Sequence, residues 1–282
     1  MKKRTFYLVA GLLVAAPSAS ALVAASSSQS ATSNPPSAPP QAGQHGFMMV
    51  GERGIAFVPA QASAATPVPL LILFHGAGGA AQDMMKPFLL EADKRGIALL
   101  AVQSKGVTWD LIKTHFSDVS QEATMLNARD RLPAVDRRIA ETTVAAFTKV
   151  VPVDAKRIGA FGFSDGAAYA LSYGAANSGS IAWVGAVAPA FATIERGARS
   201  KGQRIYIAHG KDDEIIAPGM SQSGVCPEFV KFGWAVRYEI FAGGHVIPPA
   251  IASAMLDDWL DPAARPATTG DQRCSGASPA KR

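Results

Sequence analysis

The sequence predicts an α/β protein: a single domain with a mostly parallel, twisted sheet and helices on both of its faces. Short apolar runs alternate with helix-compatible amphipathic segments, as expected of parallel strands joined by crossover helices. Hydrophobic residues make up 48% of the chain and charged residues 17%, so a sizeable core can be buried. The length of 282 residues suits one such domain. Ligands of these sheets bind at the carboxyl ends of the strands, so we expect site residues directly after strands.

The first part of the chain has the layout of a secretory signal peptide. Basic residues at positions 2–4 precede an apolar run at 6–16, and the small residues Ala-Ser-Ala at 19–21 fit a cleavage site. The apolar run is shorter than the roughly 20 residues that a membrane-spanning helix needs. The alternative to a cleaved signal peptide is an uncleaved membrane anchor. We therefore predict that residues 1–21 are removed and that the protein is exported, either periplasmic or secreted, without a stable membrane anchor.

Segments rich in small and polar residues flank the predicted domain. Residues 22–45 predict a flexible Ser/Pro-rich tether and residues 262–282 a flexible tail, which leaves the catalytic domain at 46–261. The formal charge of +5 falls to +2 when the three basic residues of the signal peptide are removed (5 − 3 = 2). This charge is too small, and the basic residues are too scattered, to predict a nucleic-acid partner.

The elements of the domain are predicted from apolar runs and from helical periodicity. The runs PLLILF, IALLAV and IAWVGAVA are unbroken, as in buried strands, whereas residues 134–149 have helical periodicity with charges on one face. The expected order is a strand or hairpin at 47–58, strand 69–74, helix 82–95, strand 97–102, helix 134–149, strand 157–161, helix 166–176, strand 181–188, strand 204–208, helix 219–232, strand 235–241 and helix 248–260. A polar stretch at 118–132 is predicted to be an insertion.

A single serine lies between two glycines where a predicted strand meets a predicted helix, in the string Gly-Phe-Ser-Asp-Gly at 162–166. A nucleophile placed there projects above the sheet on a tight turn, and larger side chains two residues before and after it would collide. The N-terminus of the following helix favours developing negative charge. Ser164 is therefore the candidate nucleophile, although a Gly-rich turn can contain a serine by chance.

A serine hydroxyl is a poor nucleophile unless a base accepts its proton. The available histidines are His45, His75, His115, His209 and His245. Of these, His245 follows a strand late in the chain, in the string FAGGH, and it is the candidate base. The alternative for His245 is an ordinary histidine of a surface loop.

An acidic loop, KDDE at 211–214, follows the strand at 204–208 and lies between the serine and the histidine in chain order, where an orienting carboxylate is expected. Asp213 is the favoured carboxylate because it stands in a His-Gly-x-x-Asp string and because apolar residues follow it at 215–216. Asp212 is the second choice, and a solvated acidic turn without a catalytic role is the alternative.

A glycine-rich loop, HGAGG at 75–79, follows the strand at 69–74. Its glycines would let backbone N–H groups approach a substrate oxygen and form an oxyanion hole. We expect one donor from Ala77 in this loop and the other from Asp165, the residue after the nucleophile. An ordinary Gly-rich turn is the alternative.

Several strings together carry a resemblance to a known superfamily: LFHGAGGA, TWD, GFSDGAAYAL, IAHGKDDEII and GGHVIPP, which span roughly 70–260. The chain resembles the α/β-hydrolases, and within them the small secreted carboxylesterases of the phospholipase/carboxylesterase and polyhydroxybutyrate-depolymerase type. The resemblance implies an α/β-hydrolase fold with Ser164 as nucleophile, Asp213 as acid and His245, in the loop after the last strand, as base. It also implies that Ala77 occupies the loop position that supplies an oxyanion donor.

The sequence singles out four further residues. Trp109 and Asp110 follow the strand at 97–102 by a short loop, so we expect them near the substrate, with Trp109 as an apolar wall; a core tryptophan is the alternative. Cys226 and Cys274 can form a disulfide in an exported chain, free thiols or a bridge between chains being the alternatives. No CxxC string or Cys/His cluster predicts a metal, and the triad needs no cofactor.

Three functions are compatible with this sequence. The first is an exported serine hydrolase that cleaves carboxylic esters, small or polymeric, through an acyl-enzyme. The second is a serine hydrolase of amide bonds, in a peptide or a polyamide such as poly(aspartic acid), which uses the same chemistry. The third is a non-catalytic binding protein on the same scaffold, against which the complete triad argues.

Overall fold

The computed structural model describes residues 43, 45–117, 126–129, 132–261 and 274, and all of them belong to one compact unit. The predicted signal peptide, nearly all of the predicted tether and nearly all of the predicted tail lie outside the described residues. None of the described helices combines the length and the apolar character needed to cross a membrane.

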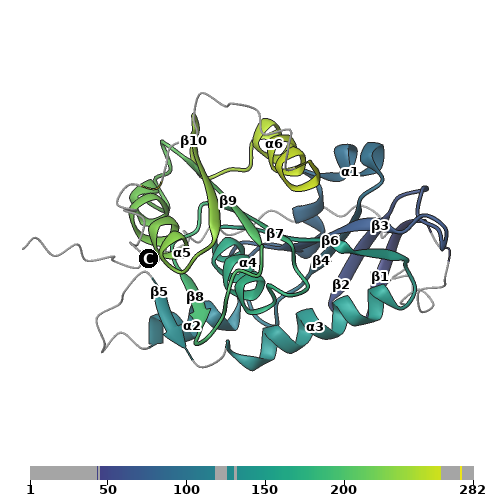
Figure 1. Cartoon of the computed structure of the whole chain (residues 1–282), viewed down its shortest axis with the longest axis horizontal. Coiled ribbons are helices and arrows are strands. Elements are labelled where there is room, and N and C mark those ends of the chain that lie inside the picture. Colours follow the sequence, from purple (N-terminus) through teal and green to yellow (C-terminus); the bar gives the residue numbers. More distant parts are fainter. Residues whose placement is uncertain (1–42, 44, 118–125, 130–131, 262–273, 275–282) are drawn as a thin grey trace, which may run out of the picture. The chain divides into compact units, whose positions relative to one another are not determined.

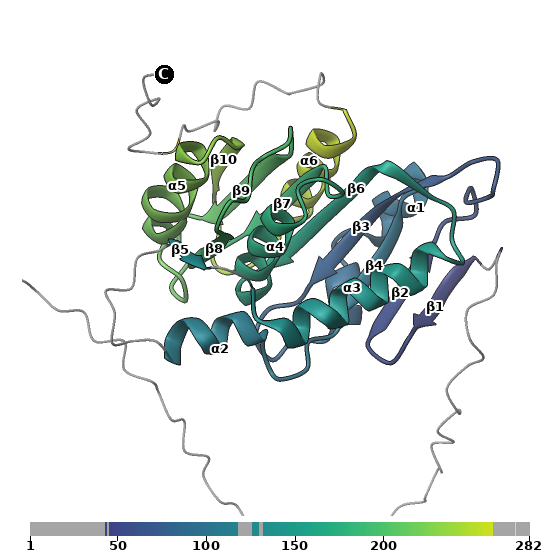
Figure 2. The same ribbon diagram turned by 60° about the horizontal axis from the view of Figure 1, so that its bottom comes forward.

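Within the described residues, eight strands form one sheet in the order β1-β2-β4-β3-β6-β7-β9-β10, which can be followed across Figure 2. Strand β2 runs antiparallel to both of its neighbours, and the other neighbouring strands are parallel. The bounds are β1 Gly46–Val50, β2 Gly54–Val58, β3 Val68–Phe74, β4 Ala98–Val102, β6 Val153–Phe163, β7 Trp183–Val187, β9 Arg204–Gly210 and β10 Ala235–Phe241. The prediction of a mostly parallel sheet is confirmed.

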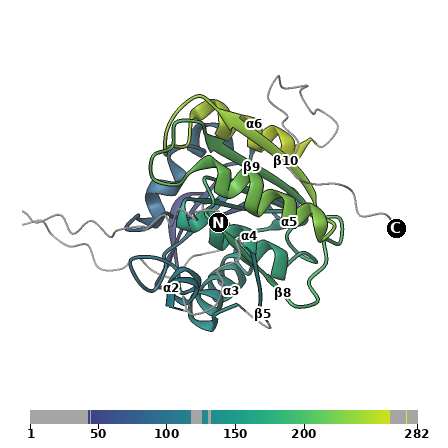
Figure 3. The same cartoon turned by 90° about the vertical axis from the view of Figure 1, so that its left-hand side faces the viewer.

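Helices cover both faces of the sheet. The bounds are α1 Leu89–Arg95, α2 Asp110–Ser117, α3 Ala134–Thr148, α4 Asp165–Ala176, α5 Cys226–Lys231 and α6 Pro249–Leu260. Side chains of β3 alternate between two buried clusters: Ile72 belongs to the cluster that includes residues of α3, α4 and α5, whereas Leu71 and Leu73 belong to the cluster that includes residues of α1 and α6. Figures 1 and 3 show the same division, with α6 on one side of the sheet and α3 on the other.

Two predicted helices are broken in the structure. The helix predicted at 82–95 is instead a 3₁₀ helix, Ala81–Met85, followed by α1. Pro87 lies between them and has no N–H to continue the helical ladder, which explains the break. The helix predicted at 219–232 is a π-helical segment, Met220–Val225, followed by α5, whose first turn contains Pro227.

A second, small sheet was not predicted. Strand β5, Leu126–Arg129, pairs in parallel with β8, Ala192–Glu195. Strand β5 falls in the stretch 118–132 that the sequence marks as an insertion, and positions 118–125 and 130–131 of that stretch lie outside the described residues. Both strands, LNAR and ATIE, alternate apolar and polar residues, but each has only four residues, and so short a pattern does not distinguish a strand from a loop.

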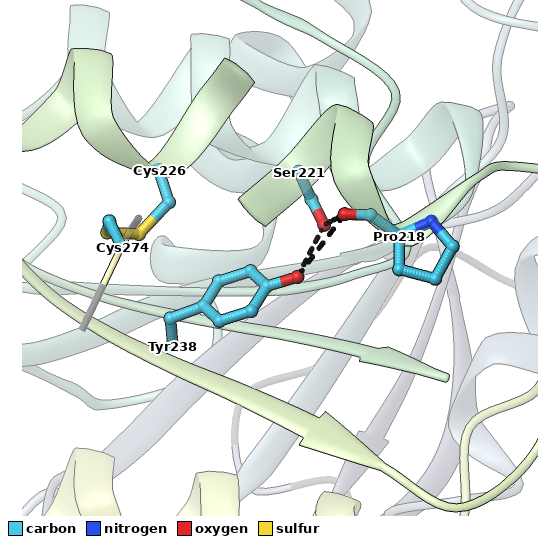
Figure 4. Close-up of a disulfide and its surroundings, with 5 residues drawn as sticks. All are labelled: Pro218, Ser221, Cys226, Tyr238 and Cys274. Carbon is cyan, nitrogen blue, oxygen red and sulfur yellow. Dashed lines mark hydrogen bonds between the residues drawn. A yellow bond between two sulfur atoms is a disulfide. The ribbon is translucent and has the colours of Figure 1, made fainter. Parts of the chain in front are cut away.

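A disulfide joins Cys226 and Cys274, whose Cα atoms are 5.6 Å apart. Cys226 is the first residue of α5 and is fully buried, and Cys274 is buried as well (Figure 4). The bond therefore attaches one point of the C-terminal segment to the helix that follows the acidic loop.

Candidate active site

The serine between the two glycines lies where β6 turns into α4. Ser164 has φ 57° and ψ −124°, a conformation that costs a non-glycine residue about 1–3 kcal/mol and that the surrounding structure must hold in place. A Cβ atom on Gly162 would collide with the backbone oxygen of Gly166, and one on Gly166 would collide with the backbone of Phe74 at the end of β3. Only glycine fits at these two positions, which is the reason for the serine's flanking residues.

The candidate base and acid meet above the same edge of the sheet. The Nδ1 atom of His245, four residues after the end of β10, is 2.7 Å from Oδ2 of Asp213, which follows β9. The ring of His245 also packs on the ring of Phe163, the residue before Ser164, with 4.6 Å between ring centroids. His245 therefore contacts both Asp213 and the residue that precedes Ser164, whereas none of the hydrogen bonds among the described residues joins Ser164 itself to His245. Such bonds are often long before substrate binds.

The carboxylate of Asp213 is buried and fully engaged. Its Oδ1 atom accepts hydrogen bonds from the backbone N–H groups of Ile215 and Ile216, both at 2.9 Å. Burial favours the neutral acid, but the Ile216 N–H, the His245 imidazole and the Ile215 N–H outweigh it and lower the pKa of Asp213. An ionised carboxylate accepts from Nδ1–H of His245, so Nε2 of that ring is left to accept a proton. Asp212, the second choice, instead makes an exposed contact of 2.9 Å with Lys211.

The glycine-rich loop lies beside the serine. A Cβ atom on Gly76 would be 3.2 Å from Cβ of Ser164, so this loop passes directly over the nucleophile. Among the described residues, the backbone N–H groups of Ala77 and Asp165 donate to no protein acceptor. They are therefore available to a substrate oxygen. The carboxylate of Asp165 accepts a hydrogen bond of 2.5 Å from the Thr108 hydroxyl, which ties the start of α4 to the loop before α2.

A buried histidine that the sequence did not mark supports this loop. His75 accepts the backbone N–H of Ser104 at Nε2 (3.1 Å), so its Nδ1–H donates to the carbonyl of Gly76 (2.7 Å). Burial lowers the pKa of His75 and keeps it neutral. The string His-Gly directly after a strand could have indicated this residue, because a histidine at the end of a strand can hydrogen-bond to the glycine turn that follows it.

The structure overturns the prediction that Trp109 forms a substrate wall. Its side chain is fully buried, stacks on Tyr169 with 4.3 Å between ring centroids, and donates from Nε1 to the backbone oxygen of His75 (2.8 Å). A side chain without exposed surface cannot contact substrate, so the core alternative holds.

Asp110 holds two helices together. Its Oδ2 atom accepts the N–H groups of Val135 (3.0 Å) and Asp136 (3.1 Å) at the start of α3, while its own N–H donates to Asp136 (2.6 Å). Burial raises the pKa of Asp110. These contacts give Asp110 a structural task; its predicted contact with substrate remains a prediction.

The histidines and acids of the described chain do not gather into a metal site: no group of three or more His, Cys, Asp or Glu side chains is placed to hold an ion there. The site as built offers a nucleophile, a base with a fixed tautomer and two free N–H donors. This set suits acyl transfer through an oxyanion.

The fold and the strained serine define an enzyme of the α/β-hydrolase class, a serine hydrolase. The family model for phospholipases/carboxylesterases matches residues 54–249, which is 196 of 282 residues (249 − 54 + 1 = 196). The chain therefore belongs to the phospholipase/carboxylesterase family. A comparison with curated proteins gave no match.

Solved structures of esterases share the fold. A carboxylesterase from Mesorhizobium loti has a TM-score of 0.53 at 18% identity, covering 77% of this chain and 99% of its own. An acetyl xylan esterase from Aspergillus awamori has a TM-score of 0.55 at 13% identity, covering 73% and 92%. A thermostable esterase has a TM-score of 0.52 at 17% identity and covers 67% of this chain, which spans only half (50%) of that protein's length. At these identities the likeness concerns the fold.

Proposed function

We propose that this protein is an exported esterase that hydrolyses carboxylic esters through an acyl-enzyme on Ser164. The observation that carries the proposal is the hydrogen bond between Nδ1 of His245 and Asp213, formed beside a serine held at φ 57° on the strand-to-helix turn. Export rests on the sequence of residues 1–21, with its basic start, apolar run and small-residue cleavage site.

The reaction follows from the positions of these groups. His245 Nε2 takes the proton of Ser164 as Oγ attacks the ester carbonyl, and the N–H groups of Ala77 and Asp165 receive the negative charge on the carbonyl oxygen. The C–O bond to the alcohol then breaks, the alcohol leaves with the proton from His245, and the acyl group stays on Ser164. Water, deprotonated by His245, then attacks the acyl carbon; the bond from that carbon to Oγ breaks, the acid is released, and His245 returns the proton to Ser164 Oγ. Asp213 stabilises the imidazolium in both halves.

Exposed apolar side chains on the loops of the site favour an apolar substrate. Val107, whose carbonyl accepts a hydrogen bond from Gly78 of the glycine-rich loop, is 73% exposed, and Ile215, which directly follows the acidic loop, is 74% exposed. Val246, next to the base, is 51% exposed. Apolar residues in such positions are suited to contact the acyl or alcohol part of an ester.

The test is hydrolysis of p-nitrophenyl esters of increasing acyl length, with the matching anilides alongside. Ser164→Ala should remove nearly all turnover and all labelling by a fluorophosphonate. Asp213→Asn should lower kcat by orders of magnitude, whereas the matched control Asp212→Asn, at an exposed position, should be nearly silent. Turnover retained by Ser164→Ala, or a larger loss at Asp212 than at Asp213, would overturn the assignment. Faster cleavage of the anilides would replace the ester with an amide substrate.

A further inference from the structure

A second histidine lies close to the oxygen of the proposed catalytic acid that also accepts the hydrogen bond from the base. The Nε2 atom of His209, the penultimate residue of β9, is 3.2 Å from Oδ2 of Asp213 and 2.9 Å from the carbonyl oxygen of Ile216. Its side chain is fully buried. The mechanism above gives His209 no task.

The hydrogen positions on this ring follow from its partners. A carbonyl oxygen only accepts, so Nε2 of His209 carries a hydrogen, which lies between Ile216 and Asp213. The other nitrogen, Nδ1, is 2.6 Å from Oγ of Ser221. Burial lowers the pKa of His209, so the ring is neutral and Nδ1 accepts the hydroxyl hydrogen of Ser221.

Ser221 is itself held from two sides. Its Oγ is 2.9 Å from the hydroxyl of Tyr238 and 3.0 Å from the carbonyl oxygen of Pro218, as Figure 4 shows. With its own hydrogen shared between Nδ1 of His209 and the carbonyl oxygen of Pro218, Ser221 accepts the hydroxyl hydrogen of Tyr238. The three side chains form a buried chain of hydrogen bonds from Tyr238 to Ser221 to His209, and Nε2 of His209 lies beside Asp213. Ser221 lies in the π-helical segment Met220–Val225, and this segment directly precedes the disulfide-bonded Cys226.

We propose that His209 is a positioning residue for the catalytic acid, and that it fixes the Asp213 carboxylate in the orientation that His245 needs. The carboxylate accepts three hydrogen bonds, from the backbone N–H groups of Ile215 and Ile216 on Oδ1 and from His245 on Oδ2, and Nε2–H of His209 lies 3.2 Å from that second oxygen. Rotation of the carboxylate away from His245 would also break its contact with His209. The inference rests on the proposed function, because it assumes that Asp213 orients the base.

Paired variants at His209 test this role. In His209→Gln the side-chain amide can still donate near the place of Nε2, whereas in His209→Leu it cannot. We expect His209→Leu to lower kcat about 10- to 100-fold with KM changed less than about twofold, and His209→Gln to regain most of that loss. The acid limb of the kcat/KM profile should move to higher pH in His209→Leu, because Asp213 then has one donor fewer near Oδ2 and stabilises the His245 imidazolium more strongly. The titratable groups that face His209 are Asp213, His245 and, through Ser221, Tyr238.

A milder pair keeps the test decisive if His209→Leu does not fold. Tyr238→Phe removes one hydroxyl from the chain and should lower kcat severalfold, whereas Tyr206→Phe removes a buried hydroxyl that donates to Glu239 and should leave kcat unchanged. Equal kcat values for Gln and Leu at position 209 with an unmoved acid limb, or equal effects of the two tyrosine variants, would overturn the proposal.

A spectroscopic readout separates this inference from the proposed function. The Nδ1–H proton of His245, donating to a carboxylate, should give a downfield proton resonance in the wild-type enzyme. That signal should broaden or shift in His209→Leu and persist in Tyr206→Phe. If the wild-type protein neither hydrolyses esters nor reacts with a fluorophosphonate, the proposed function fails, and the resonance still reports whether His209 orients Asp213. A resonance unchanged in His209→Leu would overturn the positioning role.

Discussion

Replacing Gly166 by alanine tests whether the turn at the nucleophile depends on backbone packing. A Cβ atom at this position would lie 2.5 Å from the carbonyl oxygen of His75 and closer still to that of Phe74. Real Cβ contacts are essentially never shorter than 3.0 Å, so the His75 oxygen would have to move away by at least 0.5 Å (3.0 − 2.5 = 0.5) and the Phe74 oxygen by more than that. Phe74 is the last residue of β3 and His75 the first residue of the glycine-rich loop, so the shift reaches the oxyanion donors and not only the serine.

The expected losses follow from that displacement. Overpacking of this kind costs about 1–3 kcal/mol of unfolding free energy, and the upper end applies because backbone cannot rotate out of the way as a side chain can. A misplacement approaching 1 Å at reacting groups costs up to about 100-fold in rate. We therefore expect Gly166→Ala to lose about 3 kcal/mol of stability and to lower kcat about 10- to 100-fold.

Gly174→Ala in the same helix is the matched control. There a Cβ atom would meet only the Cγ2 methyl of Val184, with the next atoms at 3.6 Å, and a valine side chain can yield. The gain of about 1 kcal/mol from replacing glycine inside a helix offsets part of the cost, and kcat should stay within about twofold. Urea unfolding and p-nitrophenyl ester hydrolysis measure both variants. Wild-type kcat in Gly166→Ala, or an equal loss of kcat in Gly174→Ala, would refute the reasoning.

Three further predictions concern the core, the disulfide and pH. Trp109→Ala should lower the unfolding free energy by about 3–5 kcal/mol while the ratio of kcat/KM values for short and long acyl esters stays constant; a changed ratio at unchanged stability would restore the substrate wall. Reducing the Cys226–Cys274 bond, which spans 48 residues, should cost about 4 kcal/mol in thermal or urea unfolding, and intact-mass and thiol-alkylation measurements check that the bond is within one chain. Because the pKa of Asp213 is lowered from 3.8, its stabilising contribution should be complete well above pH 3.8 and lost as the pH falls below it; unfolding measured across acid pH should lose this component in Asp213→Asn.

Much of the sheet could be predicted because its strands carry their own signals. The runs around 69–74 and 97–102 are apolar at every position, and such runs must be buried on both faces wherever they lie in the fold. The position of Ser164 could be predicted for a similar reason, since a tight turn between a strand and a helix requires glycine at particular neighbours. These are local constraints, and they act within a few residues of chain.

The features that the sequence did not predict depend on contacts between distant segments. Nothing near Trp109 shows that it will be covered by Tyr169, sixty residues later (169 − 109 = 60). His209 and Asp213 are only four residues apart in the sequence (213 − 209 = 4), so their contact is local. The hydrogen bonds that hold His209 in place, however, come from Ser221 and Tyr238 in other elements. The broken helix at 82–95 is different: Pro87 was a local signal that the helical periodicity around it concealed.

The acid and the base reach each other because two backbone segments approach closely at Gly210. Any side chain at this last position of β9 would collide with the carbonyl oxygen of Gly243 in the loop after β10. The N–H of Asp212 donates to that same oxygen at 2.9 Å. A backbone hydrogen bond therefore joins the acidic loop to the loop of His245, independently of the side chains of Asp213 and His245. The 2.7 Å bond from His245 to Asp213 is therefore the second connection between these loops. Breaking that bond by Asp213→Asn should disturb the proton chemistry of the base more than its location, since the backbone connection remains.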